Sequence, residues 1–276
     1  MEKITNENIK NCNINIFGNW INNNLKYNIN PIPYILIDNF LKDDTYELIN
    51  KEYPDKLDKS WWKYENPLEV KYANDKINEY SNNTKNLFYA LSHQEFINKI
   101  GNIFNIHNLE YDPYCHGGGL HMMPRYGRLN MHLDYENHPI TMKIRRLNII
   151  LYMNDEWDKS WNGDTQLWNK NMTKCIVKSY PKRNRALIFV TNDDSWHGIP
   201  DKIMCPENIF RKTIAFYYVS EKNNEKSKSR PKAVFTKKPD DKYDERFEKL
   251  FKIRTNRRIE NEDLKEIWPE WNMIKY

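Results

Sequence analysis

The segment LNMHLDY, residues 129–135, decides the fold of this chain, because its apolar and polar residues alternate with a period of two. Such alternation is typical of a β-strand with one face on a core. Similar short runs are GGGLHMM (117–123), RRLNIILYMN (145–154), TQLWN (165–169), CIVKSY (175–180), ALIFVTN (186–192) and KTIAFYYVS (212–220). Turn residues separate these runs, so the pattern predicts a sandwich or barrel of about eight strands.

Helical spacing dominates upstream of these strands. Residues 34–37 predict a strand, and an amphipathic helix follows whose inward-facing residues are predicted to be Leu41, Tyr46, Leu48 and Ile49. Apolar residues from 77 to 104 predict two helices that break near Ser92. We therefore expect a mainly β domain with flanking helices (α+β) over residues 32–221, with helical support at 38–110 and the barrel at 111–221. Residues 1–31 are polar, and we expect an N-terminal arm or a loosely packed helix there.

The composition describes a globular chain of 276 residues, 39% hydrophobic and 29% charged. No apolar run approaches the roughly 18 residues of a membrane helix, and the N-terminus lacks the apolar region of a signal peptide. We expect a cytoplasmic protein without a membrane partner. The four cysteines form no CxxC pair, which disfavours a thiolate zinc site or a disulfide framework and fits a reducing compartment.

The formal charge of +5 lies at the C-terminal end. Residues 1–221 carry 27 basic and 27 acidic side chains, whereas residues 222–276 carry 16 and 11. We therefore expect 222–276 to be a basic extension, with a solvated linker and a charged helix between 240 and 270, that stays in solvent or docks an acidic partner. If this division holds, removing the extension spares the site. Nucleic acid is a disfavoured partner, because no helix-turn-helix, zinc-finger or RNP-like string is present.

Histidines and glycines are concentrated in the strand-rich region. Five of the seven histidines and six of the eight glycines lie between residues 116 and 198. His132 and Asp134 are two residues apart on one strand, so both side chains point to the same face and can share a metal ion. A third ligand, His197, lies in FVTNDDSWHGIP. Two histidines and one carboxylate with open positions form the facial arrangement of non-haem Fe(II) oxygenases.

An arginine on a neighbouring strand predicts an anion beside this metal. In RKTIAFYYV, Arg211 and Thr213 share a face, and an unpaired buried guanidinium is costly. A dicarboxylate can supply the anion at one end and chelate the metal at the other. Strand alternation over 145–154 predicts one face with Arg146, Asn148, Ile150 and Tyr152, from which Tyr152 can donate a hydrogen bond to the same carboxylate.

These motifs together resemble the Fe(II)/2-oxoglutarate oxygenases of the prolyl-hydroxylase type. The resemblance covers residues 111–221 and runs in the family's order through GGGLH, the HLD pair, RRLNIILYMNDEW, WNGDTQLW, SWHGIP and CPENIFRKTIAFYY. It implies a double-stranded β-helix (jelly-roll, cupin-like) core. As far as the motifs go, the likeness is to a microbial or viral branch, which implies a host cytoplasm if the source is a virus.

The resemblance also implies a site. His132, Asp134 and His197 match the iron ligands, and Arg211 matches the residue that binds the distal carboxylate of 2-oxoglutarate. Further residues expected at the cosubstrate are Tyr152, Thr213 and Asn148. The implied cofactor is Fe(II), with 2-oxoglutarate and O2 as cosubstrates and ascorbate as a reductant. Candidate substrate contacts are Arg145, Arg146, His121 and Trp196, whereas structural roles are favoured for His116 and His138.

The implied function is an enzyme, a 2-oxoglutarate-dependent dioxygenase that hydroxylates a C–H bond on a protein or peptide side chain. Decarboxylation of 2-oxoglutarate to succinate and CO2 accompanies the hydroxylation. Two alternatives stay open: the same chemistry on a small molecule, glycan or nucleotide, and a catalytically silent jelly-roll module that only binds a ligand.

Overall fold

The computed structural model describes residues 3–222, 230–242 and 244–273. Its strands are β1 (Tyr34–Ile37), β2 (Trp62–Asn66), β3 (Glu69–Asn74), β4 (Glu110–Tyr111), β5 (Gly119–Met123), β6 (Arg128–Leu133), β7 (Ile144–Tyr152), β8 (Thr165–Trp168), β9 (Cys175–Ser179), β10 (Ala186–Val190), β11 (Trp196–Ile199), β12 (Arg211–Ser220) and β13 (Val234–Phe235). Its helices are α1 (Asn6–Lys10), α2 (Asp43–Glu52), α3 (Asn82–Leu91), α4 (Gln94–Phe104), α5 (Glu245–Asn256) and α6 (Asn261–Ile267), with short 3-10 turns at Asn19–Asn22, Ile77–Glu79, Lys159–Trp161 and Pro269–Met273.

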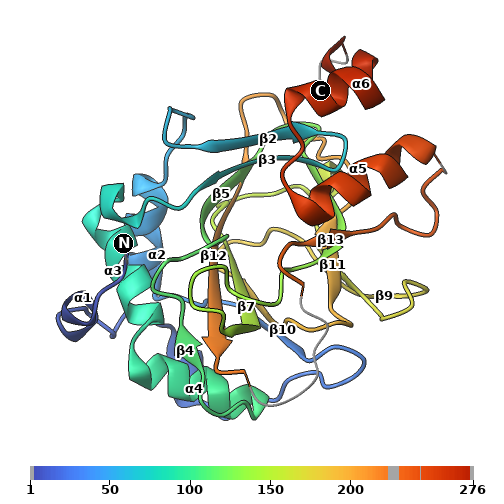
Figure 1. Ribbon diagram of the computed structural model, residues 1–276. Coiled ribbons are helices and arrows are strands. Elements are labelled where there is room, and N and C mark those ends of the chain that lie inside the picture. The colour runs from blue at the N-terminus through green and yellow to red at the C-terminus, as the bar shows by residue number, and fades with distance from the viewer. Residues whose placement is uncertain (1–2, 223–229, 243, 274–276) are drawn as a thin grey trace.

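The strands form one antiparallel sheet that curls on itself (Figure 1). Hydrogen bonding runs in the order β1-β10-β7-β12-β5-β3-β6-β11-β8-β9. Strand β3 pairs with both β5 and β6 and so joins two walls of the sheet. The first wall consists of β5, β12, β7, β10 and β1, and the second wall consists of β6, β11, β8 and β9. Side chains of the two end regions pack together in one apolar cluster, which includes Leu167 of β8 and Leu187 of β10. The expected β barrel is therefore present.

Helices α2, α3 and α4 cover the outer face of the first wall (Figure 1). Period-two alternation explains the arrangement, because Leu147, Ile149 and Leu151 of β7 face the helices while Asn148 and Ile150 face the barrel interior. The interior of the barrel therefore holds polar side chains such as Asn148 beside apolar ones such as Ile150.

Several expectations about the flanks are tested by the described residues. The two helices that break near Ser92 are confirmed as α3 and α4. Leu48 was expected to face inward but is 50% exposed, because its position on α2 turns away from the sheet. The region 38–110, expected to be helical, also contains the hairpin β2–β3. The N-terminal 31 residues are not loosely attached, since Phe17 and Trp20 are buried in the main core.

The C-terminal segment packs on the second wall instead of standing apart from it. Strand β13 pairs with β6, and α5 and α6 enclose a small core that contains Leu68, Phe235, Leu250 and Leu264. The charged helix expected between 240 and 270 is therefore present as two helices. Most of the expected linker, residues 223–229, lies outside the described residues. Within the described parts of the chain, none of the helices has the length and apolarity that crossing a membrane requires.

Candidate active site

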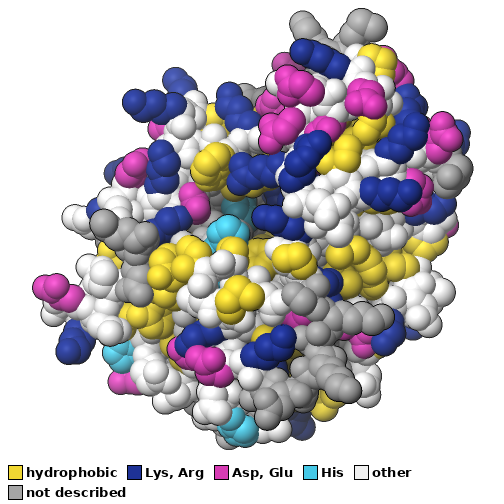
Figure 2. Space-filling model, in the orientation of Figure 1, with side chains coloured by type: hydrophobic (Ala, Val, Ile, Leu, Met, Phe, Trp, Pro, Cys, Tyr) yellow, Lys and Arg dark blue, Asp and Glu magenta, His cyan; other side chains and the backbone are white. Residues whose placement is uncertain are grey.

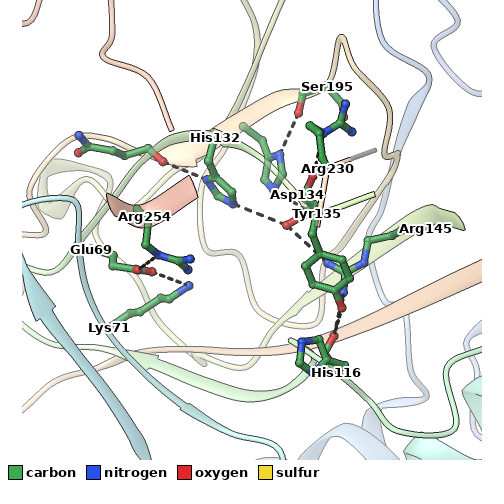
Figure 3. Close-up of polar contacts among 12 residues, drawn as sticks. Glu69, Lys71, His116, His132, Asp134, Tyr135, Arg145, Ser195, Arg230 and Arg254 are labelled. Carbon is green, nitrogen blue, oxygen red and sulfur yellow. Dashed lines mark hydrogen bonds and ion pairs between the residues drawn. The ribbon is translucent and has the colours of Figure 1, made fainter. Parts of the chain in front are cut away.

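The three predicted metal ligands meet inside the barrel. Figure 3 shows two of them, His132 and Asp134, pointing toward each other. His132 lies on β6 and pairs in register with His197 on β11, and Asp134 follows β6 by one residue. The Nε2 atom of His132 lies 3.8 Å from Asp134 Oδ1, and the Nε2 atom of His197 lies 3.6 Å from Asp134 Oδ2. One ligand atom from each residue falls within 4.8 Å of the others. This spacing suits a single ion bound by all three.

Backbone carbonyls orient both imidazoles. His132 Nδ1 donates to the Asn130 carbonyl oxygen at 3.0 Å, and His197 Nδ1 donates to the Ser195 carbonyl oxygen at 2.9 Å. A carbonyl can only accept, so the proton of each neutral ring resides on Nδ1. The lone pair on Nε2 is then directed at the position between the three residues, as metal-binding histidines require.

The protonation states also suit a cation. Burial, reinforced by the nearby His197, lowers the pKa of His132 to about 3. Burial raises the pKa of Asp134, but His197 and Arg145 outweigh it, so the pKa of Asp134 is lowered. A neutral imidazole beside an ionised carboxylate is the donor set that a divalent metal needs. Among the described residues, the buried Oδ2 atom of Asp134 has no hydrogen-bond partner, so the site fits the implied metal.

Close approach of β11 to β6 depends on Gly198. A Cβ atom at Gly198 would lie 2.7 Å from the Leu129 carbonyl oxygen and 2.9 Å from that of Asn130, which is closer than real Cβ atoms approach an oxygen. Aromatic rings then support the ligands: the Phe235 ring stacks on His132 at 5.2 Å between centroids, and the Phe189 ring meets His197 edge-on at 4.8 Å.

A cavity of about 240 Å³ extends from the triad to Arg211. The guanidinium of Arg211 is buried, donating from Nε to the Gly163 carbonyl oxygen at 2.7 Å and from Nη2 to Thr165 Oγ1 at 2.8 Å. Burial lowers the pKa of Arg211. No carboxylate forms an ion pair with it among the described residues, so the cavity offers a built position for an anion. Thr213 and Asn148 also line this cavity.

Three predicted residues, Tyr152, Trp196 and Arg146, lie outside the cavity lining. The Tyr152 hydroxyl donates to the Ser179 carbonyl oxygen at 2.8 Å and lies 2.9 Å from Thr165 Oγ1. Tyr152 is thus placed behind Thr165, and its direct contact with a carboxylate stays a prediction. Trp196 donates to the Lys170 carbonyl oxygen at 3.1 Å on the outer side of β11. His121 does line the cavity, and burial lowers its pKa to about 3.

A β-bulge reverses the expected orientation of two arginines. Val219 of β12 pairs with Arg145, whereas Tyr218 pairs with Leu147, so Arg146 has no partner across the ladder. This extra residue breaks the alternation. Arg145, and not Arg146, therefore faces the cavity, where Arg145 Nη1 lies 3.6 Å from Asp134 Oδ1. The rings of Tyr135 and Tyr217 flank its guanidinium at 3.7 and 3.4 Å.

Sequence patterns missed several lining residues. The additional cations and aromatics at the cavity mouth are Tyr64, Lys71, Lys232, Phe235, Arg254 and Arg258. The period-two run EVKYAN, residues 69–74, carried a signal for Lys71, because it predicts a strand with Glu69 and Lys71 on one face. No local pattern brings residues 231–258 back to the barrel.

Comparison with known proteins agrees with this geometry. Residues 118–219 match the 2OG-Fe(II) oxygenase superfamily. A prolyl-4-hydroxylase from Pseudomonas putida has a similar structure, with a TM-score of 0.51 and 11% identity over 69% of this chain and 93% of that one. The viral collagen prolyl hydroxylase of Paramecium Bursaria Chlorella virus-1 scores 0.44 at 13% identity, covering 68% of this chain and 96% of that one. No curated protein matches the sequence.

The fold and the matched segment define an Fe(II)-dependent oxygenase with a jelly-roll core. Residues 118–219, which include most of the barrel, are similar to the 2OG-Fe(II) oxygenase superfamily, and the chain is a 2-oxoglutarate-dependent enzyme. Its cofactor is Fe(II) and its cosubstrate is 2-oxoglutarate, for which the triad and Arg211 provide fitting residues.

Proposed function

We propose that this oxygenase hydroxylates a C–H bond on a protein or peptide side chain. The observation that carries the proposal is the buried triad His132, Asp134 and His197 in one cavity with the unpaired guanidinium of Arg211. In the overall reaction, 2-oxoglutarate and O2 react with the substrate R–H to yield succinate, CO2 and R–OH. A polypeptide substrate is favoured by the fold shared with a prolyl-4-hydroxylase.

The chain's own residues hold and orient the reactants. Fe(II) bound with 2-oxoglutarate activates dioxygen for insertion of one oxygen atom into the C–H bond. His132, Asp134 and His197 would hold the metal, and Arg211 with the Thr165 hydroxyl would hold the distal carboxylate. The Ile150 and Ala215 side chains, together with Met123, line the cavity with apolar surface that restricts water.

The test follows the gain of one oxygen atom in substrate and the formation of succinate. Protein with Fe(II) and 2-oxoglutarate is incubated with peptide pools and, separately, with pools of amino acids, glycans and nucleotides, and products are measured by mass spectrometry. We expect oxygen gain in peptides, abolished by Asp134→Asn and retained by Glu156→Gln, which makes the same change at an exposed carboxylate. Oxygen gain only in a small-molecule pool contradicts the proposed substrate, and absence of succinate contradicts the chemistry.

Two further expectations are not tested by the geometry. Ascorbate as a reductant is checked by adding it to the same succinate assay, where it should prolong turnover. The cytoplasmic setting is checked by fractionating the source cell.

A further inference from the structure

The mouth of the cavity is strongly cationic. The lining contains Lys71, Arg145, Arg211, Lys232, Arg254 and Arg258, and the only carboxylate among the described lining residues is Asp134. Arg145 and Arg211 lie deep in the cavity. We call the other four, Lys71, Lys232, Arg254 and Arg258, the basic rim. Figure 2 shows dark-blue side chains gathered around the hollow in which a histidine is visible.

A single buried carboxylate holds part of the basic rim in place. Glu69 accepts from Arg254 Nε at 2.7 Å and lies 3.2 Å from Lys71 Nζ, with its own side chain 1% exposed (Figure 3). Burial raises the pKa of Glu69, but the two cations outweigh it and lower that pKa to about 2. Glu69 is therefore ionised, and one negative charge faces two positive ones. The trio keeps a net charge of +1 at the mouth.

Arg254 has donors left for a ligand. Its Nε is used by Glu69, while the described residues supply no hydrogen-bond acceptor for its two terminal nitrogens. Its guanidinium carbon lies 5.2 Å from the Phe235 ring centroid, and that ring lies 5.2 Å from the His132 ring centroid. The guanidinium carbon of Arg254 therefore lies at most about 10.4 Å from the ring centroid of His132, one of the metal ligands.

Arg258 extends the basic rim outward. Its guanidinium stacks over Trp62 at 4.6 Å and over Tyr64 at 5.1 Å, and no described carboxylate pairs with it. Contact with two aromatic rings favours a fixed position for the guanidinium, whose N–H groups can donate two parallel hydrogen bonds to a carboxylate. Trp62 is 46% exposed, which is unusual for so large a side chain. A platform of this kind suits a carboxylate on an extended chain.

We infer that the substrate is a polypeptide with an Asp or Glu side chain close to the hydroxylated residue, received by Arg254 and Arg258. An extended chain advances about 3.3–3.6 Å per residue, so the upper limit of about 10.4 Å between the Arg254 guanidinium and His132 places an acidic residue bound at Arg254 within about three positions of the hydroxylated one. The inference rests on the proposed function. A nucleic acid is a weaker candidate, because the sequence contains no helix-turn-helix, zinc-finger or RNP-like string.

The experiment uses the full chain and randomised short peptides. One position at a time, up to three residues on either side of the modified residue, is fixed as Glu, Gln or Lys. Oxygen gain is measured by mass spectrometry, and binding of labelled peptides is measured by fluorescence anisotropy without oxygen. The variants are Arg258→Gln, Arg258→Glu and the double variant Glu69→Gln with Arg254→Gln, which removes the buried carboxylate together with its partner. Lys252→Gln is the matched control, because Lys252 is an exposed cation of α5 outside the cavity lining.

We expect a preference of at least about fivefold for Glu over Gln at one position. Arg258→Gln and the double variant should reduce that preference, Arg258→Glu should turn it toward Lys, and Lys252→Gln should leave it unchanged. Equal use of Glu, Gln and Lys peptides overturns the inference while the proposed function stands. Succinate formation without binding or oxygen gain in any peptide overturns both the inference and the polypeptide substrate. Arg258-dependent binding of a single-stranded oligonucleotide in place of peptides also overturns the inference.

Discussion

Arg211 is buried at the inner end of the cavity, and its described neighbours are neutral acceptors. A buried guanidinium gains most from a planar anion that accepts two parallel hydrogen bonds. Lysine keeps the positive charge but cannot donate two parallel hydrogen bonds to a carboxylate. Arg211→Lys should therefore raise the KM for 2-oxoglutarate about 10- to 100-fold, as expected for the loss of one charged hydrogen bond. Succinate formation at increasing 2-oxoglutarate measures the effect.

The control for this variant is Arg183→Lys, which makes the same change at a surface arginine paired with Asp43 and Glu47. Exposed ion pairs contribute little, so its KM should equal that of the unchanged protein. Equal KM values for both variants contradict the assignment of Arg211.

His121 links the cavity to acid sensitivity. Its pKa is about 3 in the folded chain, against a usual value of 6.5. Between these values the unfolded chain binds a proton that the folded chain does not, so stability falls as the pH drops from 6.5 toward 3. His121→Gln should reduce the slope of unfolding free energy against pH near pH 5 by about one proton, or ~1.4 kcal/mol per pH unit. Urea unfolding of the metal-free protein at several pH values measures the slope, and an unchanged slope contradicts the prediction.

The positions of site residues that depend only on alternation along one strand could be predicted from the sequence. His132 and Asp134 share a strand face whatever the partner strand is, and Arg211 begins its own strand. The roles of Tyr152 and Trp196 depended on acceptors far along the chain, the carbonyls of Ser179 and Lys170. No sequence pattern specifies which distant carbonyl a hydroxyl or indole will reach.

At the scale of elements, the pairing of β11 with β6 builds the metal site. Gly198 allows this pairing because any Cβ atom would collide with two carbonyl oxygens of the neighbouring strand. Gly198→Ala should therefore lower the free energy of unfolding by about 2 kcal/mol and weaken metal binding. Urea unfolding and metal titration measure the two effects. Stability and affinity equal to those of the unchanged protein contradict this account of the β11–β6 contact.

Strand alternation predicted the walls of the barrel but failed at the irregularity in β7. Strict alternation of side chains along the strand predicted that Arg146 faces the interior. The bulge at Arg146 instead turns Arg145 inward. A bulge shows itself only in the pairing between two strands, which a single strand's sequence does not record. The hairpin β2–β3 was also missed. Both of its strands alternate in sequence, but the outer strand β2 is largely exposed, so no run of buried side chains marks it.

At the scale of the whole molecule, the C-terminal segment belongs to the catalytic unit by its contacts. The division of the chain at residue 222 stays a prediction, but Phe235 stacks on His132 and Arg254 pairs with buried Glu69. The excess positive charge of this segment is thus partly placed at the cavity mouth, a location that charge counting along the sequence could not assign.

Removal of residues 222–276 should consequently destabilise the protein and weaken binding of Fe(II) and 2-oxoglutarate. Loss of β13 and α5 exposes Leu68 and one face of His132. The milder variant Phe235→Ala should cost about 3 kcal/mol of unfolding free energy. Thermal unfolding and metal titration of both variants measure these effects, and a truncated chain with full stability and affinity supports the division at residue 222 instead.

The central claim is that His132, Asp134 and His197 hold the metal on which 2-oxoglutarate binding depends. Anaerobic titration calorimetry with Fe(II), followed by 2-oxoglutarate, tests it directly. The account predicts a single equivalent of metal, 2-oxoglutarate binding only after metal, loss of both in Asp134→Asn and retention of both in Glu156→Gln. Unchanged Fe(II) affinity in Asp134→Asn, or 2-oxoglutarate binding of equal strength without metal, would contradict it.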